Sequence, residues 1–324
     1  MFPDQHLEPV TPPGRGSKDG LWAGTEDDPR LGSLVSFGSR PNPDSVLAII
    51  GFPVDEGVRR NGGRVGSAEA PGSIREVFYR MTPDPRRADF SDLARRTVDL
   101  GDLKTTGTLS EMQQRLGEVA AALLETGVTP IILGGGHETS YGHFLGYAAS
   151  SRRVSIVNFD AHVDVRPLVE EGGHSGSPFR QAIEHDSGAC LSYRVAGVQP
   201  SWNARGHIEY VVGHGGRILW ADEVASMHSL ESLYIAGKPQ EQIMVTIDMD
   251  VADGAFAPGV SAPATLGLTP DLLRSAAWLA GSTPSVGSID VVEVNPAFDV
   301  DGRTVRLAAT LLWTFISGFA ARVT

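Results

Sequence analysis

The chain has 324 residues, of which 41% are apolar and 20% charged, a composition typical of a folded globular protein. Its formal net charge of −12 argues against a nucleic-acid partner, because phosphate contacts need clustered lysines and arginines. No apolar run approaches the roughly 18 residues of a membrane span, and the N-terminus lacks a basic segment followed by an apolar one. We therefore expect a cytoplasmic protein with no membrane partner.

The single cysteine, Cys190, rules out an intrachain disulfide bond and fits a reducing compartment. A nucleophilic cysteine needs a nearby histidine or a helix N-terminus to stabilise its thiolate. Cys190 stands instead in the neutral stretch 187–191. We do not expect it to be a catalytic nucleophile.

Residues 1–45 are rich in proline, glycine and aspartate and show no clear periodicity, so we expect an N-terminal extended arm at 1–45. The rest of the chain, 46–324, shows no linker and is expected to form one catalytic domain. Within it, seven short runs are almost continuously apolar, which is typical of strands buried on both faces of a parallel sheet. They are 46–52, 97–100, 130–133, 154–159, 193–198, 243–247 and 286–292.

Segments with helical periodicity lie between these runs, most clearly at 110–125, 269–280 and 304–321. Ser110 followed by an acidic residue predicts the N-cap of the first helix, and Gly127 its end. Thr269 followed by proline predicts the N-cap of the second. Strands that alternate with helices predict an α/β fold, a three-layer αβα sandwich with a mostly parallel sheet.

Polar clusters follow four of the predicted strands, at the edge where parallel sheets bind ligands. Seven ionisable side chains, five of them carboxylates, are thereby directed to one edge of the sheet. They are His137, Asp160, His162, Asp164, Asp248, Asp250 and Glu293.

So many like charges cannot share a partly dry cleft without cations. Each motif alone has a more ordinary explanation: an Asp-x-Asp pair is typical of turns, His137 could be a capped loop residue, and Gly134-Gly135-Gly136 could form a phosphate loop. A phosphate loop is disfavoured because no Gly-Lys-Ser/Thr follows the glycines. The coincidence of three clusters at strand ends favours a site for two divalent metal ions, and oxygen-rich ligation with some imidazole suits Mn²⁺.

Three motifs resemble the signature motifs of the ureohydrolases, the family of arginase, agmatinase and formimidoylglutamase: 135–138 (GGHE), 160–164 (DAHVD) and 246–250 (TIDMD). The resemblance implies an αβα sandwich with an eight-stranded sheet, two Mn²⁺ ions per subunit and assembly into trimers or hexamers. It implies that one ion is bound by His137, Asp160, Asp164 and Asp248, and the other by Asp160, His162, Asp248 and Asp250. Asp160 and Asp248 would then bridge the two ions.

Glu293 resembles the family's glutamate that binds the cationic amidino group of the substrate. A carboxylate beside the metals can hold a planar cation with two nitrogens in a bidentate way, which agrees with that assignment. A purely structural acid at the end of a strand is the alternative for Glu293.

The loop that carries a proton-shuttling histidine in arginases and agmatinases differs here, because Ser175 occupies that position and His174 comes one residue early. His174 is therefore the candidate for proton transfer, and Ser175 is a candidate for substrate binding. Arg166, two residues after Asp164, stands where arginases have a small polar residue, and it suits a substrate with carboxylates. The segments 55–66, 295–304 and 22–27 also resemble formimidoylglutamase. Together these features favour that enzyme over arginase.

The expected reaction is hydrolysis of N-formimidoyl-L-glutamate to L-glutamate and formamide, a step of histidine degradation, by attack of a metal-bridging hydroxide. Asp250 would help to stabilise the tetrahedral intermediate, and Glu293 would hold the amidine. Four arginines are candidates for the substrate carboxylates: Arg166 first, then Arg59, Arg64 and Arg180. The open alternatives are an agmatinase, arginase or guanidino-acid hydrolase that releases urea, a non-catalytic binding protein, and a single-zinc deacetylase of related fold.

Overall fold

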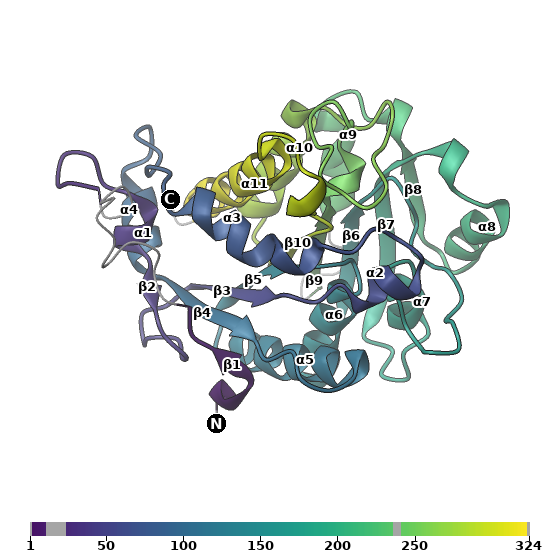
Figure 1. The fold of residues 1–324 in the computed structure, drawn as a ribbon, viewed down its shortest axis with the longest axis horizontal. Helices are drawn as coiled ribbons and strands as arrows, with labels where there is room; N and C mark the ends of the chain where they lie inside the picture. Colours follow the sequence, from purple (N-terminus) through teal and green to yellow (C-terminus); the bar gives the residue numbers. More distant parts are fainter. Residues whose placement is uncertain (1, 11–23, 236–240, 323–324) are drawn as a thin grey trace.

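The structure, a computed structural model, describes residues 2–10, 24–235 and 241–322 (Figure 1). A ten-stranded sheet passes through the molecule in the order β1-β4-β3-β5-β10-β9-β6-β7-β8, and β2 pairs with β4 beside β1. The strands are β1 (Leu7–Glu8), β2 (Ser36–Phe37), β3 (Leu47–Phe52), β4 (Thr97–Leu103), β5 (Thr129–Gly134), β6 (Val154–Phe159), β7 (Cys190–Val198), β8 (Arg217–Trp220), β9 (Gln242–Asp248) and β10 (Val286–Val292).

Every pairing between the described strands is parallel except that of β1 with β4. The sheet has ten strands rather than the expected eight because the N-terminal segment adds β1 and β2, each of two residues. These two short strands share one edge of β4. Ser36 and Phe37 pair with its beginning, and Leu7 and Glu8 pair with its end.

Helices cover both faces of the sheet, which makes the three layers (Figure 1). The face that is lower in Figure 1 carries α5 and α6, and the opposite face carries α3, α10 and α11. The helices are α1 (Leu31–Leu34), α2 (Glu56–Arg60), α3 (Ala70–Phe78), α4 (Ala88–Arg95), α5 (Leu109–Glu125), α6 (Thr139–Ala149), α7 (Pro178–Ile183), α8 (Arg205–Gly213), α9 (Met227–Glu231), α10 (Pro270–Ser282) and α11 (Arg303–Ala320).

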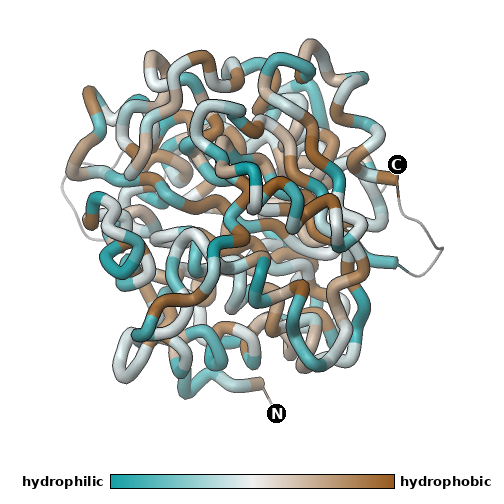
Figure 2. Tube along the Cα trace, turned by 90° about the vertical axis from the view of Figure 1, so that its right-hand side faces the viewer, coloured by the Kyte–Doolittle hydropathy of each residue, from teal (hydrophilic) through white to brown (hydrophobic). Residues whose placement is uncertain are grey.

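The sheet is buried on both faces because successive residues of its strands enter different cores. In β3, Leu47 and Ile49 join the core under α3, α10 and α11, whereas Ala48, Ile50 and Phe52 join the core under α5. All five are 0% exposed. This two-sided burial explains why the strand sequences are continuously apolar rather than alternating. Figure 2 shows such hydrophobic stretches of chain passing between polar ones.

The ends of the long helices follow ordinary capping chemistry, with one correction to the sequence prediction. Thr108, not Ser110, is the N-cap of α5, because its hydroxyl accepts from the backbone of Glu111 and the Glu111 carboxylate accepts from the Thr108 N–H. Thr269 caps α10 as predicted. Gly127, at φ +77°, ends α5 in the left-handed conformation that favours glycine.

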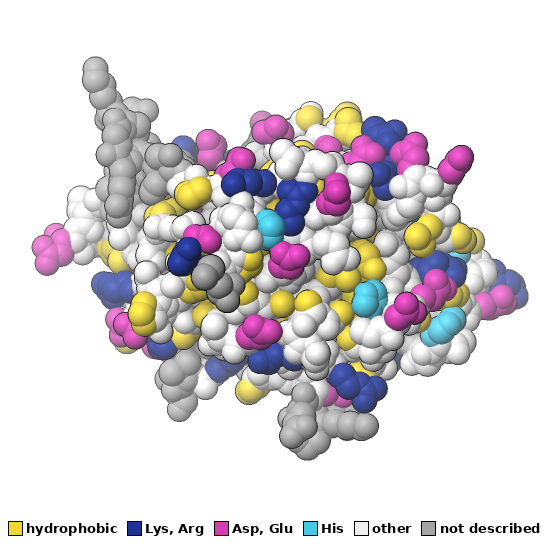
Figure 3. Space-filling view, turned by 90° about the horizontal axis from the view of Figure 1, so that it is seen from below, with side chains coloured by type: hydrophobic (Ala, Val, Ile, Leu, Met, Phe, Trp, Pro, Cys, Tyr) yellow, Lys and Arg dark blue, Asp and Glu magenta, His cyan; other side chains and the backbone are white. Residues whose placement is uncertain are grey.

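Described parts of the predicted arm pack against the domain rather than away from it. Leu31 and Val35 are buried in the core that contains α11, and Leu7 in the core that contains α5. Across the described residues, no helix has the length and apolar content needed to cross a membrane. On the face in Figure 3, acidic and basic side chains are interspersed and do not gather into a basic patch.

Candidate metal centre

Four neighbouring strands bring the predicted site residues together. β5, β10, β9 and β6 are adjacent in the sheet and parallel, so their carboxyl ends meet at one edge. The chain leaves these strands through His137, Glu293, Asp248 and Asp160 in turn. The sequence prediction that four strand ends converge is confirmed.

The first group of possible ligand atoms consists of His137, Asp160, Asp164 and Asp248, whose atoms lie within 4.8 Å of one another. The Nδ1 atom of His137 is 2.9 Å from Asp164 Oδ2, 3.0 Å from Asp248 Oδ2 and 3.3 Å from Asp160 Oδ2. Although it is buried, Nδ1 forms no hydrogen bond. A nitrogen and three carboxylate oxygens directed at one point form the donor set of a divalent cation.

A chain of buried hydrogen bonds fixes which nitrogen of His137 faces these carboxylates. Its Nε2 is 3.1 Å from Thr246 Oγ1, which is 3.1 Å from Ser140 Oγ. Ser140 donates its only hydroxyl proton to the carboxylate of Asp290, at 3.1 Å. Thr246 must then donate to Ser140 and accept from His137. The proton therefore lies on Nε2, and the lone pair of Nδ1 is left for a metal.

A second group is formed by Asp160, His162 and Asp250, again within 4.8 Å. His162 Nδ1 is 3.0 Å from Asp250 Oδ2 and 3.4 Å from Asp160 Oδ1. Asp160 therefore belongs to both groups. Asp248 belongs only to the first, because its Oδ1 is turned to accept a hydrogen bond of 2.8 Å from the Asp250 N–H.

The electrostatics of the cluster show an excess of buried negative charge. Burial lowers the pKa of His137, but three neighbouring carboxylates outweigh it and raise that pKa well above the ordinary value. Burial likewise opposes protonation of His162, whereas Asp250 and Asp160 raise its pKa to about 12. Burial, then Asp250 and Asp160, raise the pKa of Asp248 well above its ordinary range. Cations bound at this site would offset the repulsion between these buried carboxylates.

Two of the site residues have unusual backbone conformations. Asp164 has φ +41° and Glu293 φ +65°, in the left-handed region that residues other than glycine rarely adopt. Such conformations cost of order 1–3 kcal/mol each and persist where the surroundings impose them.

Glu293 is buried beside the first group of ligands. Its Oε1 accepts a hydrogen bond of 2.8 Å from the His137 N–H, and the residue is 4% exposed. Burial, followed by repulsion from Glu138, raises the pKa of Glu293 well above its ordinary value. A cationic ligand would favour the ionised form. The glycines before His137 allow the chain to pass close to residue 54, because a Cβ on Gly135 would lie 2.0 Å from the Val54 carbonyl oxygen.

The loop that carries His174 and Ser175 is fixed by backbone hydrogen bonds. His174 Nδ1 accepts from the Gly176 N–H at 3.1 Å, and its Nε2 is 3.0 Å from the Pro167 carbonyl oxygen. Both ring nitrogens are therefore engaged, and the ring is 2% exposed. This arrangement disfavours the proton-shuttling role considered for His174. Ser175 Oγ accepts from Asn61 instead.

The candidate arginines differ in whether their guanidinium groups are already held by contacts within the protein. Arg64 donates to the carbonyls of Ser261 and Val260, and its guanidinium lies 4.5 Å from the ring centre of Phe298. Arg180 donates to the Val165 carbonyl. These contacts are structural, so they do not favour Arg64 or Arg180 as ligands of a substrate.

Arg166 is exposed, and its Nη1 donates to Asn61 Oδ1 at 3.1 Å. We call the connected group of Arg166, Asn61 and Ser175 the rim of the site. Asn61 was not singled out from the sequence, and neither was His207. Asn61 lies within the segment 55–66 that resembles formimidoylglutamase, but nothing in the sequence pairs it with Arg166. His207 gave no signal in the sequence; burial, followed by the charges of Arg166 and Arg180, lowers its pKa.

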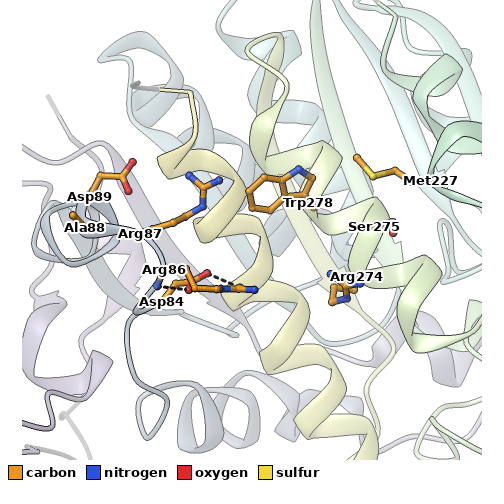
Figure 4. A pocket seen from close by; sticks show the side chains of 9 residues that line it. All are labelled: Asp84, Arg86, Arg87, Ala88, Asp89, Met227, Arg274, Ser275 and Trp278. Atoms are coloured by element: carbon orange, nitrogen blue, oxygen red, sulfur yellow. Dashed lines mark hydrogen bonds and ion pairs between the residues drawn. The ribbon is translucent and has the colours of Figure 1, made fainter.

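Other features lie apart from the strand ends. A surface cleft of about 770 Å³ is formed by the loop before α4 and by α10, with Arg87 stacked 4.8 Å from the ring centre of Trp278 (Figure 4). Arg86 is paired there with Asp84. None of the proposed metal ligands lines this cleft. Burial raises the pKa of the Cys190 thiol to about 12, in agreement with a non-catalytic cysteine.

Comparison with known proteins identifies the family. The sequence matches the arginase family over residues 45–318. It is 37% identical to formimidoylglutamase of Geobacillus thermodenitrificans over 275 residues, 82% of each chain, and 37% identical to that of Nocardia farcinica over 287 residues, 86% of this chain and 88% of the relative. The structure resembles the crystal structure of Trypanosoma cruzi formiminoglutamase with Mn²⁺, at a TM-score of 0.82 and 33% identity, covering 91% of this chain and 100% of the other. The chain belongs to the arginase family.

Proposed function

We propose that the protein is a binuclear manganese hydrolase that converts N-formimidoyl-L-glutamate and water to L-glutamate and formamide. The observation that carries the proposal is the pair of ligand groups that share Asp160 at the ends of four adjacent strands. The relatives named formimidoylglutamase, which are similar over most of the chain, support this substrate. Arg166, exposed beside the site, suits a substrate with carboxylates.

The residues present fit two manganese ions. The unpartnered Nδ1 of His137 among three carboxylates, and the group of His162 with Asp160 and Asp250, would hold one ion each. Asp248, one of the three carboxylates of the first group, would also be available to the second ion if its Oδ1 turned from the Asp250 N–H. When bound, the ions lower the pKa of water so that a nucleophile is available near neutral pH.

The protein's own side chains bind and orient the substrate. We assign Glu293 to the amidine, since its Oε1 is already fixed by the His137 N–H and its burial strengthens binding of a cation. Asp250 would stabilise positive charge on the amidine nitrogens during attack. Arg166 would bind a carboxylate of the glutamate moiety. In the reaction the bond between the formimidoyl carbon and the glutamate nitrogen breaks, and the oxygen of water passes to formamide.

We assign His174 and Ser175 to shaping the rim rather than to proton transfer. Both nitrogens of His174 are used by the backbone, and Ser175 is bonded to Asn61. Arg64 and Arg180 are assigned the same supporting part.

A substrate panel on the manganese-loaded chain tests the proposal. Formamide and L-glutamate should form from N-formimidoyl-L-glutamate, with a kcat/KM at least about 100-fold above that for agmatine, arginine or 4-guanidinobutyrate. A preference for a guanidino acid, with release of urea, would establish the second candidate, since Arg166 suits any amidino compound that bears a carboxylate. Loss of activity in Glu293→Gln with both ions retained would support the assignment of Glu293.

We further propose that 46–324 is the catalytic unit, that 1–45 acts as an N-terminal arm, and that the protein is a cytoplasmic homo-oligomer, a trimer or hexamer. The family resemblance supports the assembly, and the single cysteine supports the compartment. Sedimentation equilibrium of the purified chain tests the assembly state.

A further inference from the structure

The side chain of Asn61 connects two parts of the rim that are far apart in sequence. Asn61 directly follows α2 and is its C-cap residue. Its Oδ1 accepts from Arg166 Nη1 and its Nδ2 donates to Ser175 Oγ, both at 3.1 Å. A side-chain amide offers a donor and an acceptor on one short, flat group, so one residue can hold both partners.

The surroundings leave room for this arrangement. A Cβ on Gly176 would lie 3.0 Å from Arg166 Cδ and 3.0 Å from Asn61 Nδ2, so a larger residue there would require these two side chains to shift. The Gly176 carbonyl also accepts from the Arg166 N–H at 2.8 Å. The backbone of Arg166 is therefore bonded to this loop directly, and its side chain is connected to the loop through Asn61.

The charge of Arg166 distinguishes it from its neighbours. Three other arginines near this rim are each paired with a glutamate: Arg59, Arg60 and Arg180. The guanidinium of Arg166 forms no ion pair with a carboxylate of the described residues, and its partner Asn61 is neutral. Asn61 therefore orients the Arg166 guanidinium without offsetting its positive charge.

We propose that Asn61 is a specificity-determining positioning residue, which orients Arg166 while leaving its charge available to a carboxylate of the substrate. This inference rests on the proposed function and deepens it. An aspartate at position 61 has nearly the same shape but would form an ion pair with Arg166 and compete with the substrate. An alanine would leave the charge intact but release the side chain.

The test compares Asn61→Asp and Asn61→Ala with the native chain, all loaded with manganese. With N-formimidoyl-L-glutamate, N61D should raise KM about tenfold or more and change kcat by less than about twofold, and N61A should raise KM by less than N61D does. With an N-alkylformamidine that has no carboxylate, neither variant should raise KM. Asn42→Asp is the matched control, because this substitution adds the same charge far from the site. Asn42 donates a hydrogen bond to Ser36, which pairs with the start of β4 at the other end of the sheet.

The outcomes separate the inference from the proposed function. If the native chain hydrolyses formimidoylglutamate and N61D has an unchanged KM, the inference is overturned and the function stands. The inference also fails if N61D loses kcat and thermal stability together on both substrates, because that pattern is structural. A native chain that releases no formamide overturns the proposed function and, with it, this inference.

Discussion

Removal of one hydroxyl, in Thr246→Val, should weaken one metal site without disturbing the fold. Thr246 is 0% exposed on β9, and valine has almost its shape, so the change leaves no cavity. What it removes is the acceptor for the Nε2–H of His137 and the donor to Ser140.

The magnitude follows from the position of the lost contacts. A buried donor without a partner costs about 1–3 kcal/mol, and groups that orient metal-binding histidines contribute roughly 10- to 100-fold to metal affinity. Because His137 belongs only to the first ligand group, the loss should fall on one ion. We expect Mn²⁺ binding to weaken about 10- to 100-fold at one site and less than about threefold at the other.

Titration of the metal-free protein with Mn²⁺, followed by electron paramagnetic resonance, measures this difference. At intermediate Mn²⁺, Thr246→Val should hold one ion per chain, whereas the native chain and Thr246→Ser, which keeps the hydroxyl, should hold a coupled pair. Equal weakening of both sites would refute the reasoning, as would a serine variant as impaired as the valine variant.

Three further predictions concern stability and reactivity. Arg75→Met should lower the free energy of unfolding by about 3–5 kcal/mol in chemical denaturation, because it strands the buried carboxylate of Asp99; a loss below about 1 kcal/mol would contradict this. The hydrogen-bonded pair with Arg86 lowers the pKa of Asp84 from 3.8 to about 2, so its stabilisation is complete above pH 3.8 and is lost as the pH falls toward 2. Asp84→Asn should therefore cost about 1 kcal/mol at neutral pH, after allowance for the exposed arginine, and almost nothing at pH 2. Cys190 should react with a disulfide reagent on the order of a hundredfold more slowly in the native than in the unfolded chain, and equal rates would be inconsistent with its raised pKa.

The seven apolar runs correspond to β3, β4, β5, β6, β7, β9 and β10, and they were predictable because burial on both faces leaves a continuous apolar signal. β8 was missed, since its four residues are exposed or only half-buried. β1 and β2 were missed because two residues carry no periodicity. The shift of the N-cap from Ser110 to Thr108 reflects competition between two nearby caps, which the Glu111 side chain decides.

The clustering of the proposed metal ligands was predictable because each lies at or shortly after the end of a strand, so that the sheet topology brings them together. The rim was not predictable in this way. Arg166 and Asn61 are 105 positions apart and meet through loops, whose conformation no periodicity encodes. Likewise, the sequence places His174 near the site but cannot show that the backbone occupies both of its ring nitrogens.

The two short strands on β4 bear on how this large sheet avoids aggregation. An uncovered edge strand is a template for pairing with another copy of the chain. Here β2 covers the first half of that edge in the parallel sense and β1 the second half in the antiparallel sense. Gly101, at φ +86°, separates them, and its Cα approaches the Glu8 carbonyl so closely that a Cβ would lie 2.1 Å away. An incoming strand therefore finds no uninterrupted row of free backbone groups on β4, and edge-to-edge association is blocked there without a helix or a charged strand.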